Sequence, residues 1–321
     1  MIIKLLEGCD RELYDKHARK HGTIFNSLAW INIFNHKARA YGIYDKGNNL
    51  IGGFSIYVEK KYGLSVYRDT PFSQSSGPFL NLNAQNPVIL MTHWKNAAAA
   101  MADFFDDLSY AVISWSFNIG ISDMQPFIWK KFKVVPSYTY LLDLANSEKD
   151  LLMRMSNERR KNINKGTKDG LIVKQTMDYE SIRTLVMKTF SRQNEKLNLD
   201  HLNKILFEFA KSNNSFAYTT YNNDNPLACS FCLYDDYKAY YLLGGYDHEL
   251  KHHGAGTMAM WAAIKHAKAL GLKYFDFEGS KISHIERYFR GFGGQLTPYY
   301  QIIKAKLPLE IILKLKRREL F

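Results

Sequence analysis

The chain has 321 residues, of which 46% are hydrophobic and 23% are charged, with 8 prolines and 20 glycines. This length favours two domains over one, and the composition excludes a disordered, collagen-like or low-complexity protein. Lysine and arginine outnumber aspartate and glutamate by 43 to 31. The net charge of +12 therefore indicates an anionic partner, such as a phosphate-bearing ligand, a nucleic acid or a membrane surface.

The first half of the chain predicts an α/β domain. Its expected elements are a strand (1–6), two helices (10–22 and 25–36), a three-stranded meander (38–45, 50–61 and 63–70), a helix (87–109), a strand (111–118), a helix (123–134) and a strand (137–144). The second half follows the same order. It predicts a helix (147–170), a strand (171–176), helices near 178–195 and 200–213, a meander (215–222, 227–234 and 238–247), a helix (255–270), a strand (273–279), a short helix and a strand (298–305).

The two meanders align without gaps at an offset of 177 residues. Tyr41 meets Tyr218, Phe54 meets Phe231, and six of seventeen aligned positions are identical. We therefore expect an internal duplication: two α/β domains, 1–144 and 145–304, that share one topology and exchange their terminal strands. Residues 305–321 then form a basic amphipathic helix.

The number of cysteines and the hydropathy of the chain bear on where in the cell the protein is expected. Three cysteines exclude a disulfide scaffold. Cys229 and Cys232 form a C-x-x-C on an expected strand, where residues three apart face opposite sides, so they predict core thiols and no metal site. No segment reaches the ~18 apolar residues of a membrane span, and residues 1–13 do not have the pattern of a signal peptide. We expect a cytoplasmic protein.

The sharpest local motif is the turn from Lys251 to Gly256, which lies between a strand and a helix. A glycine-rich turn that opens a helix exposes backbone N–H groups, which together with the helix dipole form a site for a pyrophosphate. The turn does not match a P-loop or a Rossmann fingerprint. In the first half the corresponding stretch, 70–78, contains two prolines that remove donors, so we expect no such site there.

This turn resembles the acyl-CoA-binding turn Q/R-x-x-G-x-G/A of GNAT acyltransferases, with Lys251 in the first position. More widely, residues 137–170 (with R-R-K-N-I-N-K-G) and 273–301 (with F-D-F-E-G-S and F-G-G) resemble the Fem-type family of acyl and aminoacyl transferases, which consists of two fused GNAT-like domains. The resemblance implies acyl-CoA, such as acetyl-CoA, as co-substrate. Its expected binding residues are Lys251, His252, His253, Gly254, Ala255 and Gly256.

The same resemblance suggests where an acceptor binds. Arg160 and Ile163 match an R-x-x-I of the family, in which an arginine of this region is implicated in holding a substrate phosphate. We expect Arg160, with Lys37 and Arg290, to bind a phosphate-bearing or lipid-linked acceptor in a cleft between the domains. The alternative for the basic run around Arg160 is a solvated helix face.

Two carboxylates are the candidates for catalysis. Asp276 and Glu278 stand two residues apart on an expected strand and so face the same side, where one could accept the proton that an amine or hydroxyl loses during acyl transfer. The alternative is ion pairing with Arg287 or Arg290. His252 and His253 are further candidate bases. No nucleophile constellation stands out, so we expect direct attack on the thioester without a covalent intermediate.

These observations favour an acyltransferase that moves an acyl group from acyl-CoA to an amine or hydroxyl of a cell-envelope sugar or nucleotide-sugar precursor. One alternative is an aminoacyl-tRNA-dependent transferase acting on a peptidoglycan precursor, against which the lack of a long coiled-coil arm weighs. Another is a non-catalytic duplicated fold that binds phosphate ligands or RNA. The C-terminal segment from Lys304 onward combines apolar residues with six lysines and arginines, which fits either peripheral membrane contact or a packed helix with a basic outer face.

Overall fold

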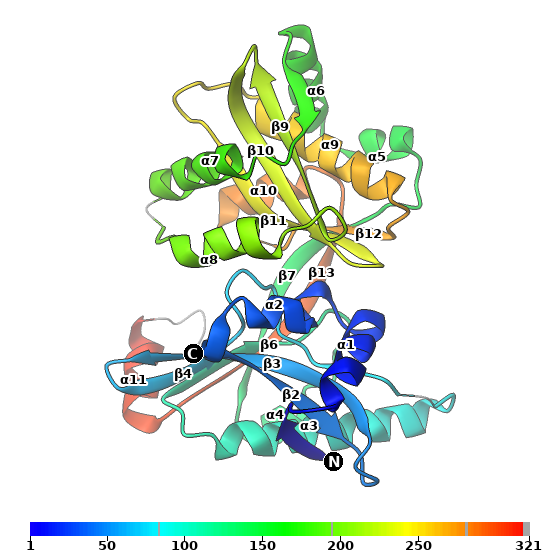
Figure 1. Ribbon diagram of the computed structural model, residues 1–321, viewed down its shortest axis with the longest axis vertical. Coiled ribbons are helices and arrows are strands. Elements are labelled where there is room, and N and C mark those ends of the chain that lie inside the picture. The colour runs from blue at the N-terminus through cyan, green and yellow to red at the C-terminus, as the bar shows by residue number, and fades with distance from the viewer. Residues whose placement is uncertain (83, 194, 280–281, 317–321) are drawn as a thin grey trace. The chain divides into compact units, whose positions relative to one another are not determined.

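The computed structural model describes residues 1–82, 84–193, 195–279 and 282–316 (Figure 1). The chain divides into two compact units. The first contains Met1–Ser137 and Pro298–Phe321, and the second contains Tyr138–Thr297. From the sequence we expected the first domain to end at residue 144 and the second domain to end at residue 304.

The first unit contains a mixed sheet and its covering helices. Its elements are β1 (Ile2–Leu5), α1 (Asp10–His21), η1 (Ile24–Asn26), α2 (Leu28–Asn32), η2 (Asn35–Lys37), β2 (Ala38–Tyr44), β3 (Leu50–Lys61), β4 (Leu64–Arg68), β5 (Phe79–Leu80), α3 (Pro87–Asp107), β6 (Val112–Ser116), α4 (Gln125–Trp129) and α11 (Leu307–Lys316). Two strands, β7 (Lys133–Asp143) and β13 (Gln295–Ala305), run across the borders of the units.

The second unit repeats this pattern. Its elements are α5 (Glu148–Arg154), α6 (Asn157–Lys168), β8 (Ile172–Gln175), α7 (Tyr179–Arg192), α8 (Leu199–Asn203), η3 (Lys204–Phe209), β9 (Ser215–Asn222), β10 (Asn225–Tyr234), β11 (Lys238–Tyr246), α9 (Ala255–Ala269), β12 (Tyr274–Asp276) and α10 (Ser283–Arg290).

Each unit completes its sheet with a strand from the other half of the chain. The strand order is β1-β2-β3-β4-β6-β13 in the first unit and β8-β9-β10-β11-β12-β7 in the second. Residues 301–305 of β13 pair with β6, and residues 141–143 of β7 pair with β12. The expected shared topology and the exchange of terminal strands are therefore confirmed.

The ungapped alignment of the two meanders is wrong by one residue. Tyr41 pairs with Phe54 in the first unit, but Tyr218 pairs with Ser230 in the second, where an unshifted repeat would pair it with Phe231. The cause is a connection that is one residue shorter in the second unit. Five residues separate the paired Tyr44 and Leu50, whereas four separate the paired Tyr221 and Pro226. The strands are equivalent, although their registers differ.

Two helices expected from the sequence are interrupted. The segment 25–36 forms three short helical pieces because Ser27 is extended (ψ 145°) and caps α2, while Asn35 has a positive φ of 55°. The segment 147–170 breaks at Met155 and Ser156, both extended, and the Ser156 hydroxyl accepts the Arg159 N–H to start α6. In both cases a serine N-cap prevails over the helical periodicity around it.

The core of the second unit positions the site. Helix α9 packs on β9 and β10, and α7 packs on β10 and β11, on opposite faces of the sheet (Figure 1). Alanine, methionine and isoleucine of α9, such as Met260 and Ile264, meet Phe275 and Phe277 in one buried cluster. This apolar packing fixes the first turn of α9 beside the end of β11.

Candidate active site

A cavity opens in the second unit where two neighbouring parallel strands separate. β11 and β12 pair only from Lys238 to Tyr240, opposite Tyr274 to Asp276. Beyond that point β11 continues, whereas the segment that follows β12 turns away at Glu278 (φ 59°) and Gly279 (φ 68°). A cavity of about 940 Å³ is lined by both diverging segments, by α6, α7 and α10, and by the first turn of α9.

The turn before α9 presents donors to this cavity. Gly254 caps the helix, and Lys251, His252, His253 and Gly256 line the cavity. The amide of Ala255 donates to the His252 carbonyl (3.2 Å). The amides of Gly256 and Thr257 have no carbonyl acceptor among the described residues. Unsatisfied N–H groups at a helix start attract an anion, as the sequence motif suggested.

The two glycines of the motif have different roles. A Cβ at Gly254 would lie 2.5 Å from the Asn162 carbonyl oxygen, so this glycine is needed for close packing of α9 against α6. A Cβ at Gly256 would meet only the Tyr288 hydroxyl, at 3.6 Å. Gly256 therefore keeps cavity space open, while Gly254 and Ala255 do not line the cavity.

His252 fastens the turn. Its Nδ1 accepts the Gly254 N–H (3.0 Å), and its Nε2 lies 3.0 Å from Asp169 Oδ2. Because Nδ1 accepts, the ring proton lies on Nε2 and is donated to the carboxylate. Lys165 pairs with the same carboxylate at 2.8 Å, and these two hydrogen bonds lower the pKa of Asp169. Because both ring nitrogens of His252 are engaged, its geometry suits holding the turn in place better than transferring a proton. His253 is exposed and lines the cavity.

A buried arginine in the cavity wall was missed from the sequence. Arg159 is 7% exposed, its guanidinium lies 4.7 Å from the ring centre of Tyr288, and it donates to Thr257 Oγ1 (3.4 Å) and Glu158 Oε1 (2.6 Å). Its Nε has no hydrogen-bond partner among the described residues. A buried guanidinium in the lining of the cavity is suited to an anionic group there.

The predicted Arg160 does not line this cavity. It is partly exposed and donates to the Met153 carbonyl at 2.8 Å. Helical spacing in the sequence could have favoured Arg159 over Arg160. Ile163 and Gly166 follow Arg159 by four and seven residues, so the three share one face of the helix. Gly166 is the residue of α6 packed against Met258 of α9, so this is the inner face.

The structure separates the two candidate carboxylates. Asp276 is fully buried, accepts from Thr139 Oγ1 (2.6 Å) and the Glu278 N–H (3.0 Å), lies 3.6 Å from Lys238 Nζ, and does not line the cavity. Glu278 does line it. The expectation that both face one side was wrong because β12 ends at Asp276 and Glu278 has a left-handed backbone, so strand alternation does not extend to it.

A tyrosine adds a proton donor that the sequence analysis missed. Tyr288 of α10 lines the cavity, and burial raises its pKa to about 12 although Arg159 and a Thr257 hydrogen bond lower it. The phenol is thus protonated at neutral pH and can donate to a developing anion. Burial also raises the pKa of the Cys229 thiol, in the same wall, to about 12, which keeps this cysteine from acting as a thiolate nucleophile.

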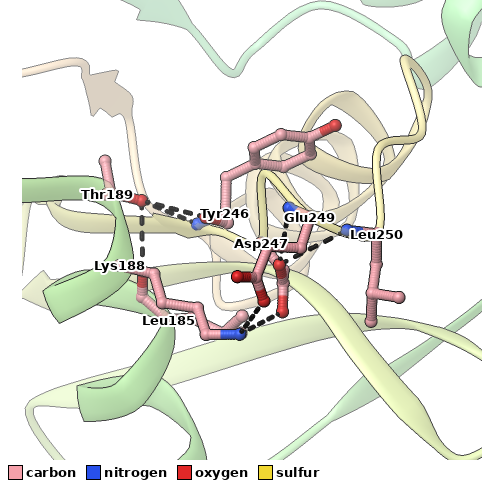
Figure 2. A network of polar contacts seen from close by, with 7 residues as sticks. All are labelled: Leu185, Lys188, Thr189, Tyr246, Asp247, Glu249 and Leu250. Carbon is pink, nitrogen blue, oxygen red and sulfur yellow. Dashed lines mark hydrogen bonds and ion pairs between the residues drawn. The ribbon is translucent and has the colours of Figure 1, made fainter. Parts of the chain in front are cut away.

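The wall formed by α7 and β11 is braced by a polar network (Figure 2). The buried Asp247 accepts the N–H groups of Glu249 (2.9 Å) and Leu250 (3.4 Å) and pairs with Lys188 Nζ at 2.6 Å. Thr189 Oγ1 accepts the Tyr246 N–H at 2.8 Å. This network ties the end of β11 to α7 and sets the start of the loop that leads to Lys251.

The other predicted binding residues lie elsewhere. Arg290 is exposed, pairs with Glu286 (3.2 Å) and does not line the cavity, although Arg287 of the same helix does. Lys37 is exposed at the end of η2 in the first unit. Their assignment to an acceptor stays a prediction.

The cavity lining is cationic. Arginine and lysine contribute four charges, against two carboxylates, and four histidines are also present; the charged residues are Arg159, Arg192, Lys251, Arg287, Glu158 and Glu278. This balance favours an anionic ligand over a neutral or cationic one.

In the first unit the equivalent separation of strands is filled by the chain itself. β4 and β6 pair at residues 66–68 and 112–114. Hydrogen bonds connect the residues that follow the two strands. Asp69 accepts the Ser116 N–H (3.0 Å), and Ser75 Oγ donates to Asn118 (2.6 Å). Burial raises the pKa of Asp69 to about 7. The segment 69–78 thus occupies the place where the second unit has its cavity.

Among the described residues, no cluster of three or more histidine, cysteine, aspartate or glutamate side chains could bind a metal ion. No helix in the part of the chain that the structure describes is both long and apolar enough to cross a bilayer.

Comparisons with known proteins agree with this geometry. Residues 157–290 match the model of the acetyltransferase (GNAT) domain family. No curated protein matches the chain.

Solved structures share the fold over almost the whole length. The crystal structure of FemX is 12% identical with a TM-score of 0.68, covering 98% of this chain and 100% of that one. L-PGS from Bacillus licheniformis is 12% identical with a TM-score of 0.55 (98% and 97%), and a conserved protein of unknown function from Bacteroides thetaiotaomicron is 12% identical with a TM-score of 0.58 (95% and 100%). Residues 157–290 of the second unit therefore match the GNAT domain family, and the chain as a whole has the fold of FemX.

Proposed function

We propose that the protein is an acyltransferase that moves an acyl group from acyl-CoA, such as acetyl-CoA, to an amine or hydroxyl of a phosphate-bearing cell-envelope sugar or nucleotide-sugar precursor. The observation that carries the proposal is the cationic cavity between the diverging strands of the GNAT domain, with the glycine turn and the buried Arg159 in its wall. The reduced thiols and the CoA donor fit a cytoplasmic reaction.

The donor binds through its diphosphate. The free amides of Gly256 and Thr257, the positive end of the α9 dipole and the charges of Lys251 and Arg159 supply donors for its oxygens. The remaining length of the cavity, lined by residues of β11 and α10, takes the pantetheine arm and directs the thioester toward Glu278.

The transfer needs one proton acceptor and one proton donor. The acceptor nucleophile attacks the thioester carbon and loses its proton to Glu278, directly or through a water molecule. The new C–N or C–O bond forms, the C–S bond breaks, and Tyr288 donates its proton to the departing thiolate. Backbone N–H groups and positioning supply the rest of the acceleration. Arg160 is proposed to contact the acceptor phosphate rather than the donor.

A transfer assay tests this proposal. Purified protein is incubated with radiolabelled acetyl-CoA and a panel of nucleotide sugars, and in a parallel arm with a mixture of labelled aminoacyl-tRNAs and a peptidoglycan precursor. Label transfer from acetyl-CoA that is lost in Glu278→Gln supports the proposal. Transfer from aminoacyl-tRNA alone replaces it with the aminoacyl alternative, and ligand binding without transfer in either arm supports the non-catalytic alternative.

A further inference from the structure

The C-terminal helix of the first unit presents an uncovered apolar face. In α11, Leu307, Ile311, Ile312 and Leu315 are 75%, 57%, 47% and 71% exposed. Leu307, Ile311 and Leu315 follow one another at four-residue intervals, and Ile312 lies beside them, so the four form one stripe along the helix. Leu309 and Leu313 are only partly exposed and lie on the other side of the helix.

Lysines border this stripe on both sides. At 100° per residue, Lys314 falls next to Leu307, and Lys316 falls just beyond Ile312. Lys314 pairs with Glu310 at 2.7 Å, and its side chain remains more than half exposed. Apolar residues flanked by lysines, whose aliphatic stems extend along the apolar surface, are the pattern of a helix that lies in a membrane interface.

A second exposed feature lies at the same end of the first-unit sheet. The turn between β3 and β4 carries Tyr62, which is fully exposed, and Leu64, which is 52% exposed, directly after the exposed Lys60 and Lys61. Two backbone hydrogen bonds place this turn near α11 (Figure 1): the Ala111 N–H donates to the Ser65 carbonyl (2.8 Å), and the Lys306 N–H donates to the Ala111 carbonyl (3.0 Å).

We propose that α11 and the β3–β4 turn form a docking surface for an anionic phospholipid bilayer. The stripe and the tyrosine enter the headgroup region, where aromatic side chains with a polar tip are favoured, while the lysines contact lipid phosphates. Charge complementarity selects this occupant: the lysines around the stripe suit anionic headgroups, and the chain has a net charge of +12. The proposal is independent of the catalytic function.

Vesicle flotation with the full-length protein tests this surface. Vesicles of phosphatidylcholine containing about a quarter phosphatidylglycerol are compared with pure phosphatidylcholine vesicles at low and high salt. The wild type is expected to float with the anionic vesicles, and high salt is expected to weaken binding. Ile311→Glu/Leu315→Glu and Tyr62→Glu should each weaken binding, the double variant by about tenfold or more because it removes apolar area and adds negative charge.

Val88→Glu is the matched control. Val88 is 72% exposed and lies in the first turn of the 21-residue helix α3, about 30 Å from the end where Asp106 pairs with Lys304 of β13. This variant should bind as the wild type does, and all variants should keep the wild-type Tm. The proposal is overturned if the wild type does not bind anionic vesicles, or if Val88→Glu is as damaging as the double variant. It is also overturned if the wild type is a dimer that the double variant dissociates without any lipid binding.

Discussion

Two adjacent arginines of α6 offer a sharp test of the donor site. Arg159 lines the cavity and is 7% exposed, whereas Arg160 lies outside the lining. We expect Arg159→Met to weaken binding of acetyl-CoA strongly and Arg160→Met to leave it unchanged. Methionine retains much of the apolar volume beside Tyr288, so the comparison isolates the charge.

The expected size follows from the contacts. A hydrogen bond to a charged group contributes about 1.5–3 kcal/mol, more than the ~1 kcal/mol of a neutral one. Glu158, whose side chain is 57% exposed, loses its partner in the variant and then repels the diphosphate by a further ~0.5 kcal/mol across water. A total of about 2–3.5 kcal/mol corresponds to a dissociation constant about 30 to 400 times higher.

Isothermal titration calorimetry with acetyl-CoA measures this difference, and acceptor kinetics complete it. Arg160→Ala should raise the acceptor KM more than the donor KM, while Arg159→Met should do the reverse. Equal losses of donor affinity in the two methionine variants would refute the assignment of Arg159. A change of less than threefold in Arg159→Met, with an unchanged Tm, would do the same.

Three further predictions concern the turn, the proton donor and the bracing network. Gly254→Ala should lower the Tm, because its Cβ would lie 2.5 Å from the Asn162 carbonyl oxygen, whereas Gly256→Ala should preserve or raise it, as alanine favours a helix; equal Tm values from calorimetry would contradict this. Tyr288→Phe should lower kcat about 10- to 100-fold with little change in acetyl-CoA affinity, and an unchanged kcat would remove the tyrosine from the mechanism. Asp247→Ala should lower the Tm by a few degrees at neutral pH, and by progressively less as the pH is lowered below about 3.9. Burial raises the Asp247 pKa, but bonds from Lys188, Glu249 and Leu250 bring it below its ordinary value, so the stabilisation is present above about pH 3.9 and disappears as the pH falls through the lowered pKa. A loss of Tm that does not become smaller as the pH is lowered would show that this carboxylate charge is not responsible.

The order of elements was predictable because each half of the chain repeats it. Apolar periodicity located helices α1, α3 and α9 and the strands of both meanders within a few residues. The residue-level register was not predictable, since the lengths of two turns decide it and the ungapped alignment assumed that they were equal. The interrupted helices were missed because Ser27 and Ser156 occur inside segments whose periodicity continues across them.

The candidate site was predictable where it depends on local sequence. The turn from Lys251 to Gly256 is a local motif, and Lys251, His252, His253 and Gly256 do line the cavity. Arg159 and Tyr288 come from helices far away in the sequence, and only the packing of α6 and α10 around α9 brings them to the turn. Asp276 and Glu278 were paired by strand alternation, which could not anticipate the left-handed backbone at Glu278.

The most direct measurement of the central claim is a calorimetric titration of Gly256→Val beside the wild type with acetyl-CoA. A side chain at this position would extend toward the Tyr288 hydroxyl, into the cavity, with little contact to the rest of the unit. We predict that the wild type binds acetyl-CoA at micromolar to submillimolar concentrations, and that the variant keeps its Tm but shows no binding. Wild-type protein that fails to bind acetyl-CoA at millimolar concentration, or a variant that binds it as tightly as the wild type, would contradict the assignment of this cavity as the acyl-CoA site.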